Sequence, residues 1–271
     1  MNELMLFVGL VVLTAAFFSF SHPVLRRIGI FALGLTTFAA GYLATGNVWV
    51  GAACVLAWLF LPWVEILLRV RKLRLPLHKQ LRQATPPSRD MFPALDELSD
   101  DIEASGYEHV ADLGWDIDGY RQFLRLFANP ERREEAALIY VEQNQIGFHF
   151  ASVTSRGTDG AVFTTWNCQV SSSLKTPPSV HVHRVAGDAS FAALVAGHGS
   201  FLRERGVEEG TLQAVDPESV RAAVERDMET QMQHNIREGL LEPADDGHGR
   251  YSWRGMLYLW FQFLRDIFRF S

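Results

Sequence analysis

One stretch, residues 48–82, constrains the rest of the chain because it joins an apolar run directly to a basic one. Residues 48–68 are long enough, at about 1.5 Å per helical residue, to cross a hydrocarbon core of roughly 30 Å. Residues 69–82, named the collar below, carry six basic side chains and no acidic one. These are Arg69, Arg71, Lys72, Arg74, Lys79 and Arg82. The pattern predicts a membrane anchor that ends at the membrane surface in the collar.

Two more apolar stretches, residues 3–20 and 28–44, precede this junction. The first lacks the positive n-region of a signal peptide, and no small-residue cleavage site precedes His22, so we expect a retained helix. The second is rich in Gly, Ala and Thr, which let membrane helices approach closely. We therefore expect three N-terminal transmembrane helices.

Lysine and arginine flanks set the expected orientation of these spans. Arg26 and Arg27 follow the first span and the collar follows the third, whereas the N-terminal tail and the turn at residues 45–47 have no basic residue. Because positive flanks stay in the cytoplasm, the N-terminus should lie outside and the C-terminal part inside. Glu65 is four residues before Arg69, a spacing that favours an interfacial ion pair over a proton path.

The part of the chain after the collar is strongly acidic. Residues 90–250 hold 28 Asp and Glu against 13 Lys and Arg. Nucleic-acid binding needs a basic surface, so we expect no nucleic-acid partner. The sequence contains no GxxxxGK[ST] or GxGxxG phosphate loop and no CxxC pair. It therefore predicts no nucleotide cofactor and no structural zinc site of the usual spacing.

This acidic part has the pattern of an α+β domain. Residues 90–105 repeat apolar side chains at helical spacing, and six short stretches then predict strands. The expected strands are residues 109–115, 121–128, 135–142, 145–153, 161–167 and 180–184. Hairpin turns are expected at Gln143-Asn144 and at residues 155–160. Such short links favour an antiparallel β-meander, with one face under helices and the other partly open.

Two helices should follow the strands and flank the meander. Asp188 or Ser190 can cap the first, and Asp216-Pro217 is a strong start for the second. In the second helix apolar residues recur every fourth position, which drifts by about 40° per step at 3.6 residues per turn. No single straight face can therefore be buried along its length, which leaves wrapping, partner contact or solvation of one half.

The last segment, residues 254–271, separates polar from apolar side chains around a helix. Its charges make it a poor fourth span, whereas its aromatic residues and arginines favour a helix lying in the membrane interface. Docking on the α+β domain or on the spans, and partner binding, are the alternatives. The residues expected to contact the membrane surface are Trp260, Phe261, Arg265 and Arg269.

Histidines are the candidates for chemistry. His181 and His183 alternate along one predicted strand, so both rings would share a face and could ligate a metal, but no third ligand has a diagnostic spacing. We expect hydrogen-bonded or surface histidines there, and a structural role for His149. The sequence predicts no catalytic residue, no metal and no cofactor.

These patterns predict a membrane-anchored α+β protein with four regions. They are a three-helix transmembrane anchor (1–68), a basic juxtamembrane linker (69–88), a cytoplasmic α+β domain (89–245) and a loop with an amphipathic interfacial helix (246–271). The expected function is a non-catalytic binding or interaction module at the inner face of a bacterial-type inner membrane. Its partners would be anionic lipids and a protein or small ligand. The alternatives are a structural subunit of a larger membrane complex and a membrane-tethered enzyme with histidines on the open sheet face.

Overall fold

The computed structural model describes residues 2–19, 23–77, 80–117, 120–143, 146–244 and 247–270. Within these ranges some side chains are not described, among them those of Glu65 and Arg269. The predicted ion pair of Glu65, the turn at Asn144 and the expected membrane contacts of Lys79 and Arg269 therefore lie outside the described residues.

Three helices form the N-terminal part, where the apolar stretches predicted them: α1 (Asn2–Ser19), α2 (Pro23–Thr45) and α3 (Val48–Arg69). One helix among the described residues is long and apolar enough to cross a membrane, Ile28–Thr45 within α2. In α1 and α3 the apolar stretches that meet the same composition are shorter, Phe7–Phe17 and Val48–Ala57. The chain thus has at least one apolar helix near its N-terminus that fits a membrane span.

Small residues let α2 and α3 pack closely. A Cβ atom built on Gly51 would lie 2.8 Å from the carbonyl oxygen of Phe38, and one on Gly41 would lie 2.8 Å from the sulfur of Cys54. Larger side chains at these two glycines would push the helices apart, so the close approach predicted for the Gly-rich stretch occurs at Gly41, whereas Gly34 has no atom within 4 Å of its virtual Cβ. Gly46, with φ of 67°, makes the turn between the helices.

A seven-stranded mixed sheet forms the centre of the C-terminal part, in the order β2-β3-β4-β5-β6-β7-β8. Its strands are β2 (Arg82–Gln83), β3 (Glu108–Ile117), β4 (Tyr120–Asn129), β5 (Glu134–Gln143), β6 (Ile146–Arg156), β7 (Val162–Trp166) and β8 (Val180–Arg184). Neighbours from β2 to β7 pair antiparallel, as predicted for β3 to β7, whereas β2 was not among the predicted strands. β8 pairs parallel to β7, so a wholly antiparallel meander is wrong. The link at residues 167–179 is long enough for the crossover that parallel neighbours need.

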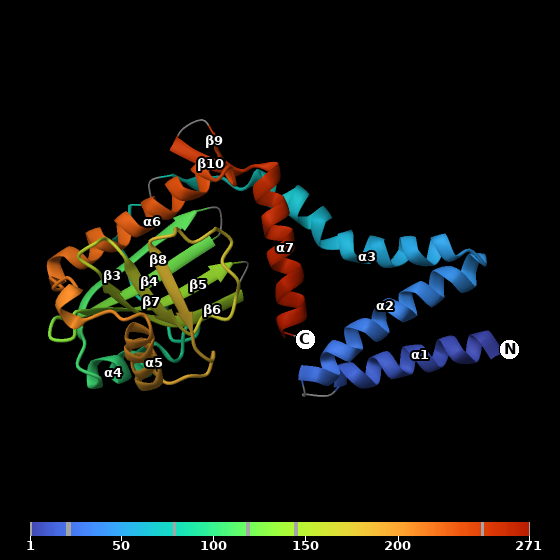
Figure 1. Cartoon of the computed structure of the whole chain (residues 1–271), viewed down its shortest axis with the longest axis horizontal. Coiled ribbons are helices and arrows are strands. Elements are labelled where there is room, and N and C mark those ends of the chain that lie inside the picture. Colours follow the sequence, from blue (N-terminus) through green and yellow to red (C-terminus); the bar gives the residue numbers. More distant parts are fainter. Residues whose placement is uncertain are drawn as a thin grey trace.

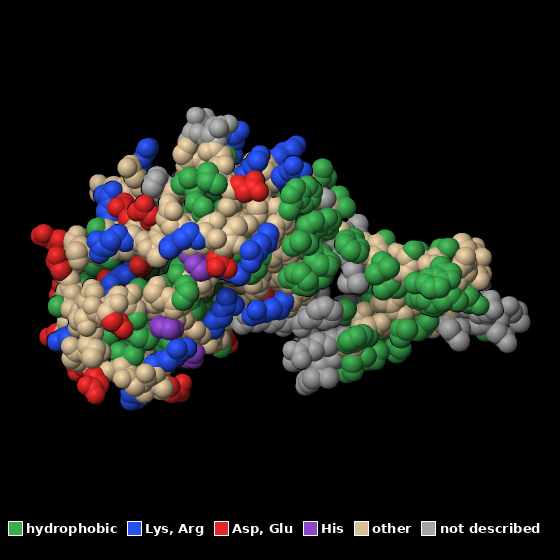
Figure 2. Space-filling model, turned by 45° about the horizontal axis from the view of Figure 1, so that its top comes forward, with side chains coloured by type: hydrophobic (Ala, Val, Ile, Leu, Met, Phe, Trp, Pro, Cys, Tyr) green, Lys and Arg blue, Asp and Glu red, His purple; other side chains and the backbone are tan. Residues whose placement is uncertain are grey.

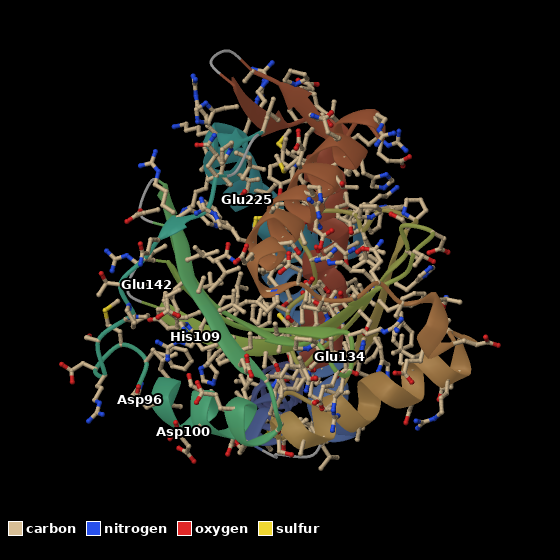
Figure 3. All side chains as sticks on the ribbon, turned by 90° about the vertical axis from the view of Figure 1, so that its left-hand side faces the viewer. Asp96, Asp100, His109, Glu134, Glu142 and Glu225 are labelled. Carbon is tan, nitrogen blue, oxygen red and sulfur yellow. The ribbon has the colours of Figure 1, made fainter. Side chains whose placement is uncertain are left out.

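Helices cover both faces of this sheet. On one face, α4 (Leu95–Ala104) and α5 (Phe191–Glu204) complete a core that includes Phe127 and Leu138. On the other, α6 (Val220–Arg237) packs over β3 and β4. Figure 1 shows α6 on one side of the sheet and α4 with α5 on the other. In Figure 3, Glu225 of α6 lies opposite Asp96 and Asp100 of α4.

The irregular apolar spacing of α6 reflects two different cores. Val220 and Val224 pack against the large sheet, with the short turns η2 (Glu209–Thr211) and η3 (Pro217–Ser219) leading into the helix. Met232 and Ile236, further along, pack in another core with α3 and the C-terminal helix. The apolar stripe of α6 therefore drifts, as predicted, because the helix passes from one core to the next.

A second, three-stranded sheet joins segments that are far apart in the chain. It has the order β1-β10-β9, with β1 (Leu75–Pro76), β9 (Leu241–Pro243) and β10 (His248–Tyr251), and it leads into α7 (Trp253–Phe270). The sequence assigned the collar to a linker and the chain from residue 246 to a loop before the last helix. Parts of the two instead form one sheet, which packs against the core of Ile66, Met232, Leu241, Tyr251 and Met256, named the α3–α7 core below.

Candidate membrane-surface site

The collar is folded onto the protein rather than extended as a free linker. It leaves α3 through the short turn η1 (Val70–Lys72) and continues as extended chain into β1. Because side chains alternate along extended backbone, Leu73, Leu75 and Leu77 enter the α3–α7 core while Arg74 is exposed. The alternation of leucine with basic residues thus has a structural reason.

The far end of the collar is fixed on α6. Leu81 is completely buried, its amide N–H donates to a carboxylate oxygen of Glu225 over 2.9 Å, and its carbonyl accepts from the guanidinium of Arg221. The collar therefore binds both sheets of the C-terminal part, which fixes the α+β domain relative to the end of α3.

Four cations surround a cavity of about 440 Å³ beside the end of α3. Arg71 and Lys72 come from η1, Arg74 from the chain before β1, and Arg250 from β10. The cavity, named the basic cavity below, forms because β1 pairs with β10, bringing Leu75 opposite Gly249. Its other lining residues are Leu73, Pro243 and Ala244.

Among the residues that the structure describes, few carboxylates lie near this charge. The described lining of the basic cavity contains no acidic residue. Glu242, on β9, pairs with Arg250 at 3.4 Å. Both partners of this pair are about half exposed, so the pair leaves the electrostatic potential of the cavity positive.

The C-terminal helix begins against the same sheet. Ser252 caps α7 by accepting a hydrogen bond from the amide N–H of Gly255 over 3.0 Å. Gly255 packs directly on the carbonyl of Leu240, and Met256 is 1% exposed. Further along, the ring of Trp260 lies 5.6 Å from that of Phe60 on α3, so α7 docks on the end of the apolar helices.

One side of α7 stays uncovered by the protein. Trp253, Leu257 and Phe261, each four residues from the next, are 54%, 47% and 62% exposed. Arg254 and Arg265 are also exposed. Figure 2 shows hydrophobic side chains gathered between the C-terminal part and the N-terminal helices, with Lys and Arg side chains beside them. Figure 1 shows α7 running across α3 rather than alongside it.

The distal half of α7 is tied to the link between β7 and β8. The amide N–H of Ser171 donates to Asp266 over 3.1 Å, and the hydroxyl of Ser171 donates to the other carboxylate oxygen. Thus α7 is held at both ends, by β10 and α3 at one end and by the crossover link at the other.

The sequence-predicted contact residues divide into two groups. Arg71, Lys72 and Arg74 come together at the basic cavity, whereas Arg69, at the end of α3, and Arg82, on β2, are exposed but do not line it. On α7, Phe261 and Arg265 are exposed, while Trp260 packs inward on Phe60 and Trp63.

Sequence reasoning missed two members of this site, Trp253 and Arg250. Trp253 lies one residue before the predicted start of the terminal helix, and Arg250 was assigned to a polar loop. The available signal was the alternation in residues 248–251, which is too short to distinguish a strand from a loop.

The candidate histidines lie on the sheet face that α4 and α5 pack against, where His149 is exposed and His181 and His183 are half-buried. His149 stacks on Phe92 with ring centroids 4.7 Å apart, and His183 stacks on Phe201 at 5.3 Å. His181 stacks on Phe163. No group of three or more metal-ligating side chains occurs among the described residues.

A further histidine, His198 of α5, is completely buried between two hydroxyl groups. Its Nε2 lies 3.1 Å from the Oγ of Ser155 and its Nδ1 lies 3.0 Å from the Oγ1 of Thr165. Burial, with His183 nearby, lowers the pKa of His198 to about 4, so the ring is neutral at physiological pH. Since Ser155 is also completely buried, the group fastens α5 to the sheet and no substrate reaches it.

Comparison with protein-family models, with curated proteins and with solved structures found no match to this chain.

Proposed function

We propose that this protein is a multi-pass inner-membrane protein whose acidic α+β domain is a non-catalytic binding or interaction module at the cytoplasmic surface. Two contacts hold the domain there: the collar at the end of α3, and α7. The observation that carries the proposal is the stripe of Trp253, Leu257 and Phe261, which α7 leaves exposed although the helix is docked at both ends.

The exposed apolar side chains of the N-terminal helices support membrane crossing. Val12 on α1, Phe31 and Leu35 on α2, and Leu56 and Val64 on α3 are all more than two-fifths exposed. In water such a surface would be a costly liability, whereas in a bilayer it contacts lipid chains. The path of α7 across α3 supports a helix that lies along the membrane surface while the three others pass through it (Figure 1).

Charge explains why two contacts are needed. An acidic domain is repelled by an anionic membrane over about one Debye length, roughly 8–10 Å. Each basic residue near the surface contributes about 1 kcal/mol of attraction. The collar cations and the arginines of α7 therefore offset the repulsion where the domain approaches the lipid.

The cytoplasmic placement of the α+β domain can be tested with a reporter protein that is fused after Ser271 and is active in only one compartment. We expect a fluorescent protein that folds only in the cytoplasm to be active and a phosphatase that works only in the periplasm to be inactive. The reverse result would place the α+β domain outside and end the proposal.

A structural role in a larger membrane complex is the second candidate. The close packing at Gly41 and Gly51 and the exposed apolar faces of the spans favour it, because a helix layer of this kind can pack against other subunits. Native purification in a mild detergent separates the two. Stoichiometric co-purifying membrane subunits support the structural role, and a chain that runs alone supports the first proposal.

A further inference from the structure

We propose that the basic cavity binds the phosphate-bearing headgroup of an anionic lipid, with a preference for a phosphate monoester over a phosphodiester. The inference rests on the proposed function, since it requires the cavity to lie at a membrane surface. It goes further by assigning a lipid class to four residues: Arg71, Lys72, Arg74 and Arg250.

Depth in the membrane is the first argument. Arg71, Lys72 and Arg74 follow the last residue of α3, Arg69, by two to five positions. At about 2 Å per residue in a 3-10 turn and about 3.3 Å in extended chain, they lie roughly 4–13 Å beyond the apolar helix. Headgroups occupy the outer roughly 5–8 Å of each leaflet, so Arg71 and Lys72 lie at the depth of the lipid phosphates and Arg74 lies a few ångströms beyond it.

Unbalanced charge is the second argument. Within the described residues, none of Arg71, Lys72 and Arg74 forms an ion pair with a carboxylate, and Arg250 is shared with Glu242. A phosphodiester offers one negative charge and two free oxygens, whereas a monoester offers up to two charges and three oxygens. Three cations from one short segment match the second group better, and arginine can hold it by paired hydrogen bonds.

The cavity wall is the third argument. The guanidinium of Arg71 lies 4.8 Å from the centroid of the Trp253 ring, which limits its freedom before a ligand arrives. Leu73, Pro243 and Ala244 supply an apolar part of the lining, suited to the glycerol end of a lipid. A volume of about 440 Å³ is within the range of small-ligand sites and exceeds what one phosphate group fills.

The test uses the full chain in neutral phosphatidylcholine micelles that contain equal amounts of phosphatidic acid and phosphatidylglycerol. Native mass spectrometry measures the ratio of the two lipids retained by the protein. The cavity variant is R71Q/K72Q/R74Q. The control, R82Q/R254Q/R265Q, also removes three positive charges, at exposed residues outside the cavity. Thermal unfolding of both variants checks that they fold.

We expect the wild-type chain to retain about fivefold more phosphatidic acid than phosphatidylglycerol, which corresponds to one additional charge contact of about 1 kcal/mol. The control should keep this ratio, and the cavity variant should bring it close to one. The proposed lipid site would be wrong if the wild-type chain retained the two lipids equally, or if both variants lost the preference for phosphatidic acid to the same extent. A reporter fused after Ser271 that is still active in the cytoplasm would then leave the proposed function standing without the lipid site.

A soluble phosphate ester is the other source of the same chemistry. Glycerol 3-phosphate, which is the headgroup of phosphatidic acid without its acyl chains, is added to the same micelles. We expect it to leave the retained lipid unchanged at equal concentration. Displacement of phosphatidic acid at that concentration would assign the cavity to a soluble ester and contradict a lipid site.

Discussion

The guanidinium of Arg71, just after the last apolar helix, lies 4.8 Å from the ring centroid of Trp253, the first residue of the C-terminal helix. These residues lie close to the start of the two segments for which the sequence predicted separate membrane contacts. Their contact makes the collar and α7 one continuous surface. A substitution that moves α7 should therefore also change the membrane end of the domain.

Gly255→Ala should detach the start of α7. A Cβ atom at this position would meet the carbonyl oxygen of Leu240, which is backbone and cannot give way. Overpacking of this kind costs about 1–3 kcal/mol. We expect a lower thermal unfolding midpoint and faster amide hydrogen exchange in residues 253–260.

Gly210→Ala is the matched control for that change. Gly210 has no atom within 4 Å of its virtual Cβ and no positive φ, so alanine should fit without strain. Equal effects of the two substitutions would show that the contact of Gly255 with Leu240 does not hold the helix.

Asp266→Asn should loosen the distal half of α7. The carboxylate accepts from both the amide N–H and the hydroxyl of Ser171, and hydrogen bonds to a charged group contribute about 1.5–3 kcal/mol each when well formed. Both groups are half-buried, so the lower end of that range is expected. Amide hydrogen exchange should become faster near residues 262–268 but stay unchanged near Met256. Unchanged exchange at both ends of α7 would mean that the contact between Asp266 and Ser171 does not hold the helix.

Protonation of His198 should reduce the stability of the α+β domain in acid. The pKa of this residue is about 4 in the folded chain and near 6.5 when unfolded, so the unfolded chain binds more protons between these values. The free energy of unfolding should therefore fall as the pH drops from about 6.5 to about 4, by about 3 kcal/mol at most.

His198→Gln isolates this contribution. The variant should be less stable at neutral pH because glutamine does not reproduce the hydrogen bonds of His198 to Ser155 and Thr165. Its free energy of unfolding should no longer contain the pH dependence that His198 contributes. Glu134 titrates with the opposite sign, since burial raises the pKa of its carboxyl, and it is unchanged in both chains. If the free energy of unfolding changes equally with pH from 6.5 to 4 in the wild-type chain and in the variant, His198 is not the group responsible.

Removing Arg156 should destabilise the attachment of α6. Its guanidinium binds both carboxylate oxygens of Glu135 at 3.0 Å and also binds Asp227 of α6. Although burial alone would lower it, the hydrogen bonds to Asp227 and Glu135 raise the pKa of Arg156. Arg156→Met leaves the buried Glu135 without a partner, which costs about 3–5 kcal/mol.

The double change Arg156→Met with Glu135→Gln is the control for that cost. It removes the uncompensated charge, so thermal unfolding should return most of the way to the wild-type midpoint. A double variant as unstable as the single one would mean that packing rather than charge explains the loss.

Local patterns in the sequence predicted much of the fold. Apolar runs located α1 to α3, Ser190 caps α5 as one of the two predicted candidates, and side-chain alternation located β3 to β8 within a few residues. Each of these elements is encoded by its own residues through hydrophobic period or capping chemistry. The parallel pairing of β8 was missed because the short-link argument was extended to a link long enough for a crossover.

The three-stranded sheet β1-β10-β9 and the basic cavity were not predictable in this way. β1 is two residues long, Leu75 and Pro76, and has no period of its own. It exists because it pairs with Gly249 and His248, far away in the chain, and Arg250 reaches the collar cations only through that pairing. The collar was correctly identified as a concentration of charge, but its convergence depends on tertiary contacts.

Lipid exposure of Phe261 tests the central claim most directly. A spin label is attached to Phe261→Cys in the full chain, in anionic vesicles, with Cys54 and Cys168 replaced by alanine. A second label at Ala222→Cys, on an exposed position of α6, reports the aqueous side. If α7 lies in the membrane interface, the label at position 261 is relaxed by oxygen and shielded from a water-soluble nickel chelate, while that at position 222 behaves oppositely. Equal relaxation of both labels by the chelate would place α7 in water and contradict the account.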